Sequence, residues 1–384
     1  MATDAHQVVH RPLVVLQPTT FCNIDCQYCY LPGRSSRKRM SVEVIRRIAA
    51  EVLGTNLYDG EIHFLWHLGE PLSVPPDYYE EAFSEIARIN QSYGREYVHT
   101  FQTNATLINE RWIALIKKHH VRIGVSLDGP AFIHDRERIT RRGTGTHAAV
   151  LSGVQLLQEH GVPFAVIAVL TNFTLDYPDE FFNFYSEQGI SRVGYNIDEI
   201  EGVHTSTSFI HREAVARYKR FVSRIVQLSD SSGGAVRLRE VWDNLRSIVM
   251  GADPYNLANK PLRILNFDVD GNFSTYCPEL VAAKSERYGD FVMGNILVNG
   301  LDDLLANPVF QLVNREVEEG LALCERTCPY WSYCGGGEPS SKFFQYGRFD
   351  VAETTTCRIH KQATVDVLVD YLEAKLPGVD RGNL

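Results

Sequence analysis

The sequence predicts an α/β protein whose first half folds as a partial, open TIM-like (β/α)6 barrel. Six short apolar segments alternate with amphipathic segments from Leu13 onward, a pattern typical of parallel strands joined by right-handed helical crossovers. Six repeats are too few to close an eight-stranded barrel. Polar residues directly follow most of the apolar segments, as expected where the carboxyl ends of parallel strands form a binding site.

The expected strands begin at residue 13 and then occupy residues 61–68, 99–102, 121–126, 164–170 and 191–196. The expected helices cover residues 41–54, 78–93, 109–119, 147–160 and 178–188. The first helix shows the supporting signals most clearly. Ser41 is a suitable N-cap, apolar residues recur at helical spacing along one face, and Gly54 ends the segment.

The overall composition is that of an ordinary globular protein with room for two domains, since 44% of its 384 residues are hydrophobic and 22% are charged. A formal net charge of −9 argues against a partner made of duplex nucleic acid, because such proteins need clustered Lys and Arg. No apolar run approaches the roughly 18 residues of a membrane span, and the first twelve residues lack a secretory signal. We therefore expect a cytoplasmic protein, in which the eight cysteines are ligands rather than disulfides.

Three of those cysteines, Cys22, Cys26 and Cys29, follow the first strand with the spacing C-x3-C-x2-C. A 4Fe-4S cluster takes four ligands, so three thiolates on one loop would leave one iron open for another ligand. A structural zinc site or three buried free thiols are the alternatives. A closed zinc site needs four N or S ligands, and no fourth one stands beside this loop.

The loop resembles the signature of the radical S-adenosylmethionine (SAM) enzymes, in its spacing and in Tyr28 before the third cysteine. In that family the open iron binds SAM, which is reductively cleaved to methionine and a 5′-deoxyadenosyl radical. The HLGEP segment resembles the family's GGEP element, with Leu68 in place of its first glycine. The resemblance and the strand-end positions together imply these SAM-binding residues: Tyr28, Gly69, Glu70, Pro71, Gln102, Asn104, Ser126, Asp128, Arg138 and Asn196.

The regular alternation of strands and helices ends after residue 201. Two helical stretches, 210–228 and 236–250, flank the polar link SDSSGG, and the segment around Asp270-Gly271 carries a strong hairpin signal. We therefore divide the chain into an N-terminal tail (1–12), a barrel (13–201), bridging helices (202–260) and a C-terminal domain (261–384).

The C-terminal domain contains Cys324, Cys328, Cys334 and Cys357, enough to close a second 4Fe-4S cluster or a zinc site. Their arrangement resembles the SPASM domain of radical SAM peptide-modifying enzymes, which implies one auxiliary cluster held by these four thiolates. Of the ligands to a second auxiliary cluster only Cys277 remains, with Glu338 in place of another. We expect Cys277 to be a free thiol.

Several phrases across nearly the whole chain, among them FLWHLGEPL and DGNFSTYCPEL, resemble the cyclophane-forming radical SAM/SPASM peptide maturases of the GrrM/OscB type. This resemblance implies a ribosomally made precursor peptide as substrate, hydrogen abstraction from a Cβ, and cross-linking to an aromatic ring. It also implies an electron donor such as ferredoxin or flavodoxin. Glu279 and Asp290 are the candidates for the base that takes the ring proton.

Two alternatives remain open. The anaerobic sulfatase-maturating enzymes use an aspartate directly after the cysteine at the Cys277 position, where this chain has Pro278. An iron–sulfur electron carrier would use the same cysteines, but it would leave Glu70, Ser126 and Arg138 without a purpose. Formation of 5′-deoxyadenosine from SAM separates an enzyme from a carrier.

Overall fold

The computed structural model describes residues 9–251, 256–281 and 283–375. Within them a nine-stranded sheet has the strand order β11-β10-β2-β4-β5-β6-β7-β8-β9. The six predicted strands are confirmed, and each pairs in parallel with the next one along the sheet. They are β2 (Leu13–Leu16), β4 (Ile62–Trp66), β5 (Tyr97–Thr103), β6 (Arg122–Ser126), β7 (Phe164–Leu170) and β8 (Arg192–Ile197).

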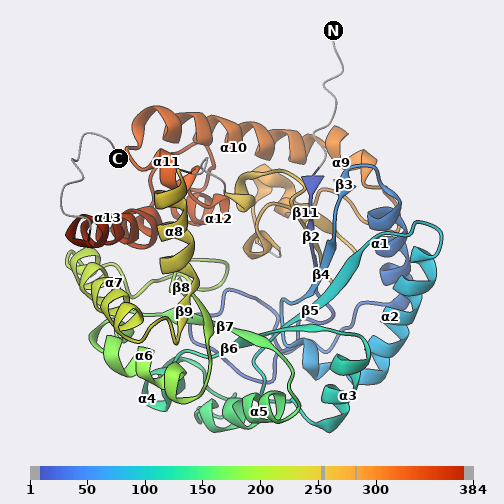
Figure 1. Cartoon of the computed structure of the whole chain (residues 1–384). Coiled ribbons are helices and arrows are strands. Elements are labelled where there is room, and N and C mark those ends of the chain that lie inside the picture. The colour runs from blue at the N-terminus through green and yellow to red at the C-terminus, as the bar shows by residue number, and fades with distance from the viewer. Residues whose placement is uncertain (1–8, 252–255, 282, 376–384) are drawn as a thin grey trace.

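The predicted helices lie outside the curved sheet (Figure 1). They are α1 (Val42–Gly54), α2 (Pro76–Asn90), α3 (Glu110–Lys118), α5 (His147–Glu159) and α6 (Pro178–Glu187), joined by the short, unpredicted helix α4 (Ala131–Glu137). Ser41 caps α1 as expected, because its side chain accepts a hydrogen bond from the Val44 amide. The open α/β barrel predicted from the sequence is therefore correct.

The sheet is longer than predicted because three strands from later in the chain extend it. Helices α7 (Ala214–Ser231) and α8 (Arg239–Met250) flank β9 (Arg237–Leu238), which pairs with β8. The predicted hairpin is present as β10 (Ile264–Phe267) and β11 (Phe273–Thr275). However, β10 also pairs in parallel with β2, with Leu265 opposite Val14, so the hairpin continues the barrel sheet.

The remaining helices lie beside the open side of the barrel (Figure 1). They are α9 (Asp302–Ala306), α10 (Pro308–Thr327), α11 (Trp331–Cys334), α12 (Pro339–Tyr346) and α13 (Ala363–Lys375), of which α13 packs against α7 and α8. Among the described residues, no helix combines the length and hydropathy that crossing a membrane requires.

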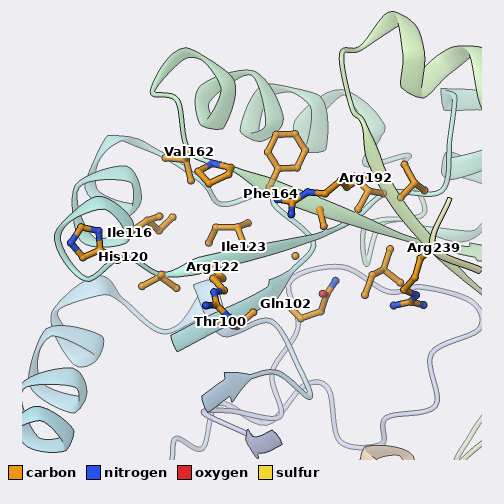
Figure 2. A pocket seen from close by; sticks show the side chains of 18 of the residues that line it. Thr100, Gln102, Ile116, His120, Arg122, Ile123, Val162, Phe164, Arg192 and Arg239 are labelled. Carbon is orange, nitrogen blue, oxygen red and sulfur yellow. The ribbon is translucent and has the colours of Figure 1, made fainter. Parts of the chain in front are cut away.

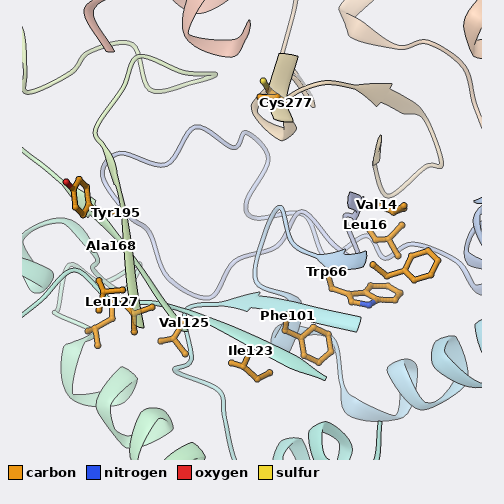
Figure 3. Close-up of a cluster of buried hydrophobic side chains, with 14 of the residues drawn as sticks. Val14, Leu16, Trp66, Phe101, Ile123, Val125, Leu127, Ala168, Tyr195 and Cys277 are labelled. Atoms are coloured by element: carbon orange, nitrogen blue, oxygen red, sulfur yellow. The ribbon is translucent and has the colours of Figure 1, made fainter. Parts of the chain in front are cut away.

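The main core lies between the sheet and the outer helices. Trp66 of β4 and Phe101 of β5 are fully buried, and both rings pack on Tyr79 of α2, with centroids 5.3 and 4.8 Å away. Figure 3 shows Trp66 and Phe101 in the same layer as Val14 and Ile123. Each such side chain contributes roughly 1.5–3 kcal/mol by leaving water. This layer fixes the positions at which the strands end.

The turn after β4 has a constrained backbone. Gly69 has φ +130°, and a Cβ on it would lie 2.3 Å from the Thr19 carbonyl oxygen. The preceding Leu68 also has a positive φ, +67°, although it stands where the GGEP element has glycine. Its side chain is buried in a small cluster with Val15 and Leu31. The leucine therefore keeps the left-handed backbone at a steric cost that its burial helps to offset.

Gly69→Ala is expected to destabilise the protein by roughly 3 kcal/mol, because it adds both backbone strain and a clash with Thr19. Gly94→Ala is the matched control, since Gly94 also has a positive φ but a Cβ added there would meet no heavy atom within 4 Å. The control should cost only about 1 kcal/mol. Urea unfolding of both variants measures the difference, and equal losses would contradict this explanation.

Candidate active site

A cavity of about 590 Å³ lies where the barrel strands end, and most of the predicted site residues line it. The three cysteines of the N-terminal loop share it with these residues: Tyr28, Gly69, Glu70, Gln102, Asn104, Ser126, Arg138, Asn196 and Glu279. Residues that are far apart in the sequence therefore meet in one space, as the strand-end rule predicts.

The cysteine loop is held by the last residue of α4 and by the segment that follows it. The amide of Asp25 donates to the Ile139 carbonyl over 2.7 Å, and the amide of Gln27 donates to the Glu137 carbonyl over 2.9 Å. Arg141 donates to the Cys22 carbonyl. These contacts fix the backbone between the cysteines. Burial raises the pKa of the Cys22 and Cys26 thiols to about 12, so the two side chains would bind as thiolates only if a metal centre supplied a compensating positive charge.

Asp128 does not line the cavity but positions two residues that do. Its Oδ2 accepts hydrogen bonds from the Tyr28 hydroxyl at 2.5 Å and from Arg138 Nε at 2.9 Å. Its Oδ1 accepts from the Val169 amide in β7 at 2.9 Å. Arg138 is only 6% exposed, and its Nη1 lies 3.9 Å from Cys26 Sγ. The Asp128 carboxylate thus holds the Arg138 guanidinium and the Tyr28 ring in place at the cysteine loop.

Glu70 has a comparable role at the ends of β4 and β5. Its carboxylate accepts hydrogen bonds from Thr103 Oγ1 at 2.6 Å, from the Asn104 amide at 2.8 Å and from the Leu72 amide at 2.9 Å. Burial raises the pKa of Glu70 to about 7 despite these donors. Asn104 in turn donates to Asn23 in the cysteine loop. Pro71 lies beside this network in a short 3-10 turn and does not line the cavity.

A larger cavity, of about 1090 Å³, lies at the opposite, amino-terminal ends of the strands and contains none of the cysteines. Gln102 and Arg239 are among its lining residues (Figure 2), and both also line the cysteine cavity. Two glycines make room for them, because a Cβ at Gly124 would meet Gln102 Oε1 at 2.2 Å and one at Gly194 would meet Arg239 Cζ at 2.8 Å. These side chains lie between the two cavities and line both, as do Ile167 and Asp243.

Four glutamates line the wall of the cysteine cavity away from the barrel: Glu199, Glu201, Glu279 and Glu338. Burial raises the pKa of Glu279 to about 7, and burial and then the charge of Glu279 raise the pKa of Glu201. Glu199 accepts hydrogen bonds from Ser341 and Thr356. Glu338 lies 3.6 Å from Lys361, which also lines the cavity.

Sequence reasoning missed Glu199 and Glu201 as site residues. They follow β8 by only a few positions, so the rule that selected Asn196 could have found them. Asp290 lies elsewhere, in an exposed turn where it pairs with Lys284 at 2.9 Å. The structure therefore brings only one of the two candidate bases, Glu279, into the cavity. Cys277 is 1% exposed and lies close to Glu279 and Glu338, and burial together with these carboxylates raises its pKa.

The second cysteine group also comes together. A small pocket is lined by Cys324, Cys328, Cys334 and Cys357. The first three lie on or next to α10 and α11, and Cys357 begins the π-helix Cys357–Gln362 that leads into α13. Cys357 Sγ accepts a hydrogen bond from Thr354 at 3.2 Å, and Cys324 Sγ lies 3.5 Å from the Ala352 carbonyl. In the described part of the chain, no three His, Cys, Asp or Glu side chains converge on a single-ion site. This finding does not bear on an iron–sulfur cluster, because each of its thiolates binds a different iron and the thiolates need not converge on one point.

Comparisons of sequence identify relatives. The family model described as Radical SAM superfamily matches residues 16–185. The protein sll1766 of Synechocystis sp. is 37% identical over 369 residues, covering 95% of this chain and 92% of the relative. A serine-type anaerobic sulfatase-maturating enzyme of Bacteroides thetaiotaomicron is 32% identical over 185 residues, which covers 46% of this chain and 44% of that enzyme.

Comparisons of structure agree on the fold. The structure titled native anSMEcpe with bound AdoMet and Cp18Cys peptide superposes with a TM-score of 0.79 at 18% identity, covering 95% of this chain and 99% of that one. SuiB of Streptococcus suis bound to precursor peptide SuiA gives a TM-score of 0.62 at 14% identity, covering 91% and 76%. The matched family model and the long alignment with the Synechocystis relative show that the chain belongs to the radical SAM superfamily of enzymes, whose members bind a 4Fe-4S cluster and SAM.

Proposed function

We propose that the protein abstracts a hydrogen atom from the Cβ of a residue in a ribosomally made precursor peptide and joins that carbon to an aromatic side chain, forming a cyclophane. One observation carries the proposal: the same cavity contains the three-cysteine loop on one wall and Glu279 on another. A substrate in this cavity would therefore meet a radical source and a base. The fold neighbours anSMEcpe and SuiB have both been solved with peptides bound, which supports a peptide substrate.

The described residues fit the cofactors of the superfamily. Cys22, Cys26 and Cys29 would hold the cluster, and the cavity beside them has polar groups suited to the amino, carboxylate and ribose groups of SAM. When bound, these cofactors supply a 5′-deoxyadenosyl radical. Arg138 is a planar donor suited to a carboxylate, and Asp128 holds it in place. Glu70 fixes the ends of β4 and β5. Gln102 and Asn104 at the end of β5, and Ser126 at the end of β6, contribute further polar groups.

The atoms and electrons of the reaction balance once SAM and an external one-electron carrier are included. One C–H bond of the substrate breaks as a C–H bond forms in 5′-deoxyadenosine. The carbon radical adds to the ring, and the ring then loses one proton and one electron. Glu279 takes the proton, because burial raises its pKa to about 7 and thereby makes it a stronger base. An external one-electron carrier such as ferredoxin or flavodoxin supplies one electron at the start and can recover one at the end.

The rest of the proposal concerns the second half of the chain. The four-cysteine pocket would hold one auxiliary 4Fe-4S cluster, as in a SPASM domain, and residues 261–384 would form that domain. The helices of residues 202–260 would bind the leader of the peptide. Cys277 would remain a free thiol, since its surroundings offer carboxylates and Ser340 rather than further thiols.

Formylglycine formation is the second candidate, favoured by the similarity to anaerobic sulfatase-maturating enzymes. Pro278 removes the aspartate expected there, although Glu279 places a carboxylate nearby. A cyclophane and a serine-derived formylglycine both lose two hydrogen atoms, so mass alone does not separate them. Trapping with a hydrazine reagent labels an aldehyde, whereas tandem mass spectrometry of a cross-linked peptide shows a ring that resists fragmentation.

Cleavage of SAM provides the first test. The reduced, anaerobically reconstituted protein should form 5′-deoxyadenosine, measured by liquid chromatography. Cys26→Ala should lower the rate at least about 100-fold, because two thiolates hold the cluster poorly. Cys277→Ala is the control, a buried cysteine outside the loop, and should retain most of the iron and activity. Equal losses in the two variants would contradict the assignment of the loop.

The role of Glu279 provides a pH test. The base form of a carboxyl whose pKa is raised to about 7 is present above that pH, so cross-linking should fall as the pH drops below about 7. Glu279→Gln should lower cross-linked product at least about tenfold while 5′-deoxyadenosine still forms. Asp290→Asn is the control and should leave both unchanged. A Glu279→Gln enzyme with normal product and an unaltered pH profile would rule out this base.

A further inference from the structure

Lys342 is a buried lysine beside the four-cysteine pocket. It lies on α12, its residue is only 2% exposed, and its Nζ lies 3.8 Å from Cys324 Sγ. An ammonium group is strongly hydrated in water, and burying it without an opposite charge costs several kcal/mol. The fold therefore needs a source of negative charge close to this side chain.

No carboxylate among the described residues provides that charge. Within residues 9–251, 256–281 and 283–375, no ion pair involves Lys342, and its side chain donates its hydrogen bond to the Cys324 sulfur. Glu316 of α10 is also buried, but its carboxylate accepts hydrogen bonds from Tyr288 at 2.6 Å and from Arg287. The cysteines are therefore the anionic partner that the structure offers to Lys342.

The space around Lys342 is shaped by two glycines. A Cβ at Gly320 would lie 3.0 Å from Lys342 Nζ and 2.2 Å from the Phe349 carbonyl oxygen. A Cβ at Gly337 would lie 2.7 Å from Cys357 Sγ and 3.8 Å from Lys342 Cε. Larger residues at these positions would push the ammonium or the thiol away. The ammonium group is thus enclosed next to the sulfurs instead of reaching solvent.

A second lysine near the same pocket differs from Lys342 in its exposure to solvent and in having a carboxylate partner. Lys361 lines the four-cysteine pocket, but its side chain is 32% exposed and lies 3.6 Å from Glu338. Its charge is shared between the Glu338 carboxylate and Cys334, and its side chain is partly hydrated. Lys361 therefore serves as an internal comparison for Lys342.

We propose that Lys342 compensates the negative charge of the four-cysteine site and raises the reduction potential of the iron–sulfur cluster bound there. This inference rests on the auxiliary cluster of the proposed function. Thiolates outweigh the positive charge of a 4Fe-4S core, and reduction adds one more negative charge. A fixed cation in a poorly hydrated environment stabilises the reduced form more than the oxidised form.

The test uses the full chain with Cys22, Cys26 and Cys29 all changed to alanine, so that only the four-cysteine site binds a cluster. A redox titration followed by electron paramagnetic resonance gives the reduced-to-oxidised ratio at each potential. At the potential where the parent is half reduced, Lys342→Met should lower that ratio at least about tenfold, because one buried charge is lost. Lys342→Arg should stay close to the parent. Lys361→Met should change the ratio less than Lys342→Met, and Lys284→Met, at an exposed position, should not change it.

The outcomes distinguish the inference from its premise. A parent without iron at the four-cysteine site would overturn the auxiliary cluster and this inference together. A parent with a full cluster but an unchanged ratio in Lys342→Met would overturn the role of Lys342 alone. If the Lys342→Met protein does not retain iron, the iron content of the Lys342→Gln and Lys342→Arg proteins decides between charge compensation and a packing role. Iron retained only with arginine supports charge compensation, whereas iron lost with arginine too indicates a packing role and overturns it.

Discussion

The carboxylate of Asp128 is the contact on which the cysteine cavity depends most. It accepts hydrogen bonds from the cysteine loop through Tyr28, from the end of α4 through Arg138, and from β7 through the Val169 amide. Three separate segments therefore share one buried anion, which is 1% exposed. An anion this deeply buried is tolerated only when its oxygens are fully hydrogen-bonded. The position of the cysteine loop therefore depends on the positions of β7 and of the end of α4, through this one carboxylate.

The cavity has two walls of different chemical character. The barrel side carries thiols, amides and the Arg138 cation, whereas the opposite side carries glutamates contributed by the segment after β8 and by the C-terminal region. The pairing of β10 with β2 supports this arrangement, because it brings the chain that contains Glu279 alongside the first barrel strand. The chemistry that we propose needs both walls, one for the radical and one for the proton.

Local patterns in the sequence predicted the barrel because they act within one strand or one helix. Alternating apolar segments gave the six parallel strands, Ser41 gave the start of α1, and Asp270-Gly271 gave the hairpin. The sequence did not show that β10 pairs with β2, since no local rule links segments so far apart. It also did not show the Leu68 conformation, because a leucine with positive φ is stabilised by its tertiary surroundings and not by its own preference.

For the site, strand-end reasoning placed most of the predicted residues in one cavity, but it did not separate residues that face the cavity from those behind it. Asp128 and Pro71 follow strands as Ser126 and Glu70 do, yet they do not line the cavity. Asp290 is the other base predicted from the sequence, but its turn lies at the surface, where it pairs with Lys284. Burial of Lys342 could not be foreseen, because lysine is rarely buried and its partner comes from another helix.

The central claim is that the three-cysteine loop leaves one iron open and that SAM fills that position. Pulsed electron–nuclear double resonance on the reduced, anaerobic protein with SAM labelled with ¹⁷O in its carboxylate and ¹⁵N in its amino group tests it most directly. The claim predicts hyperfine coupling of both labels to the cluster, which disappears in the Cys26→Ala protein. Absence of both couplings, with a protein nitrogen bound to the fourth iron instead, would contradict it.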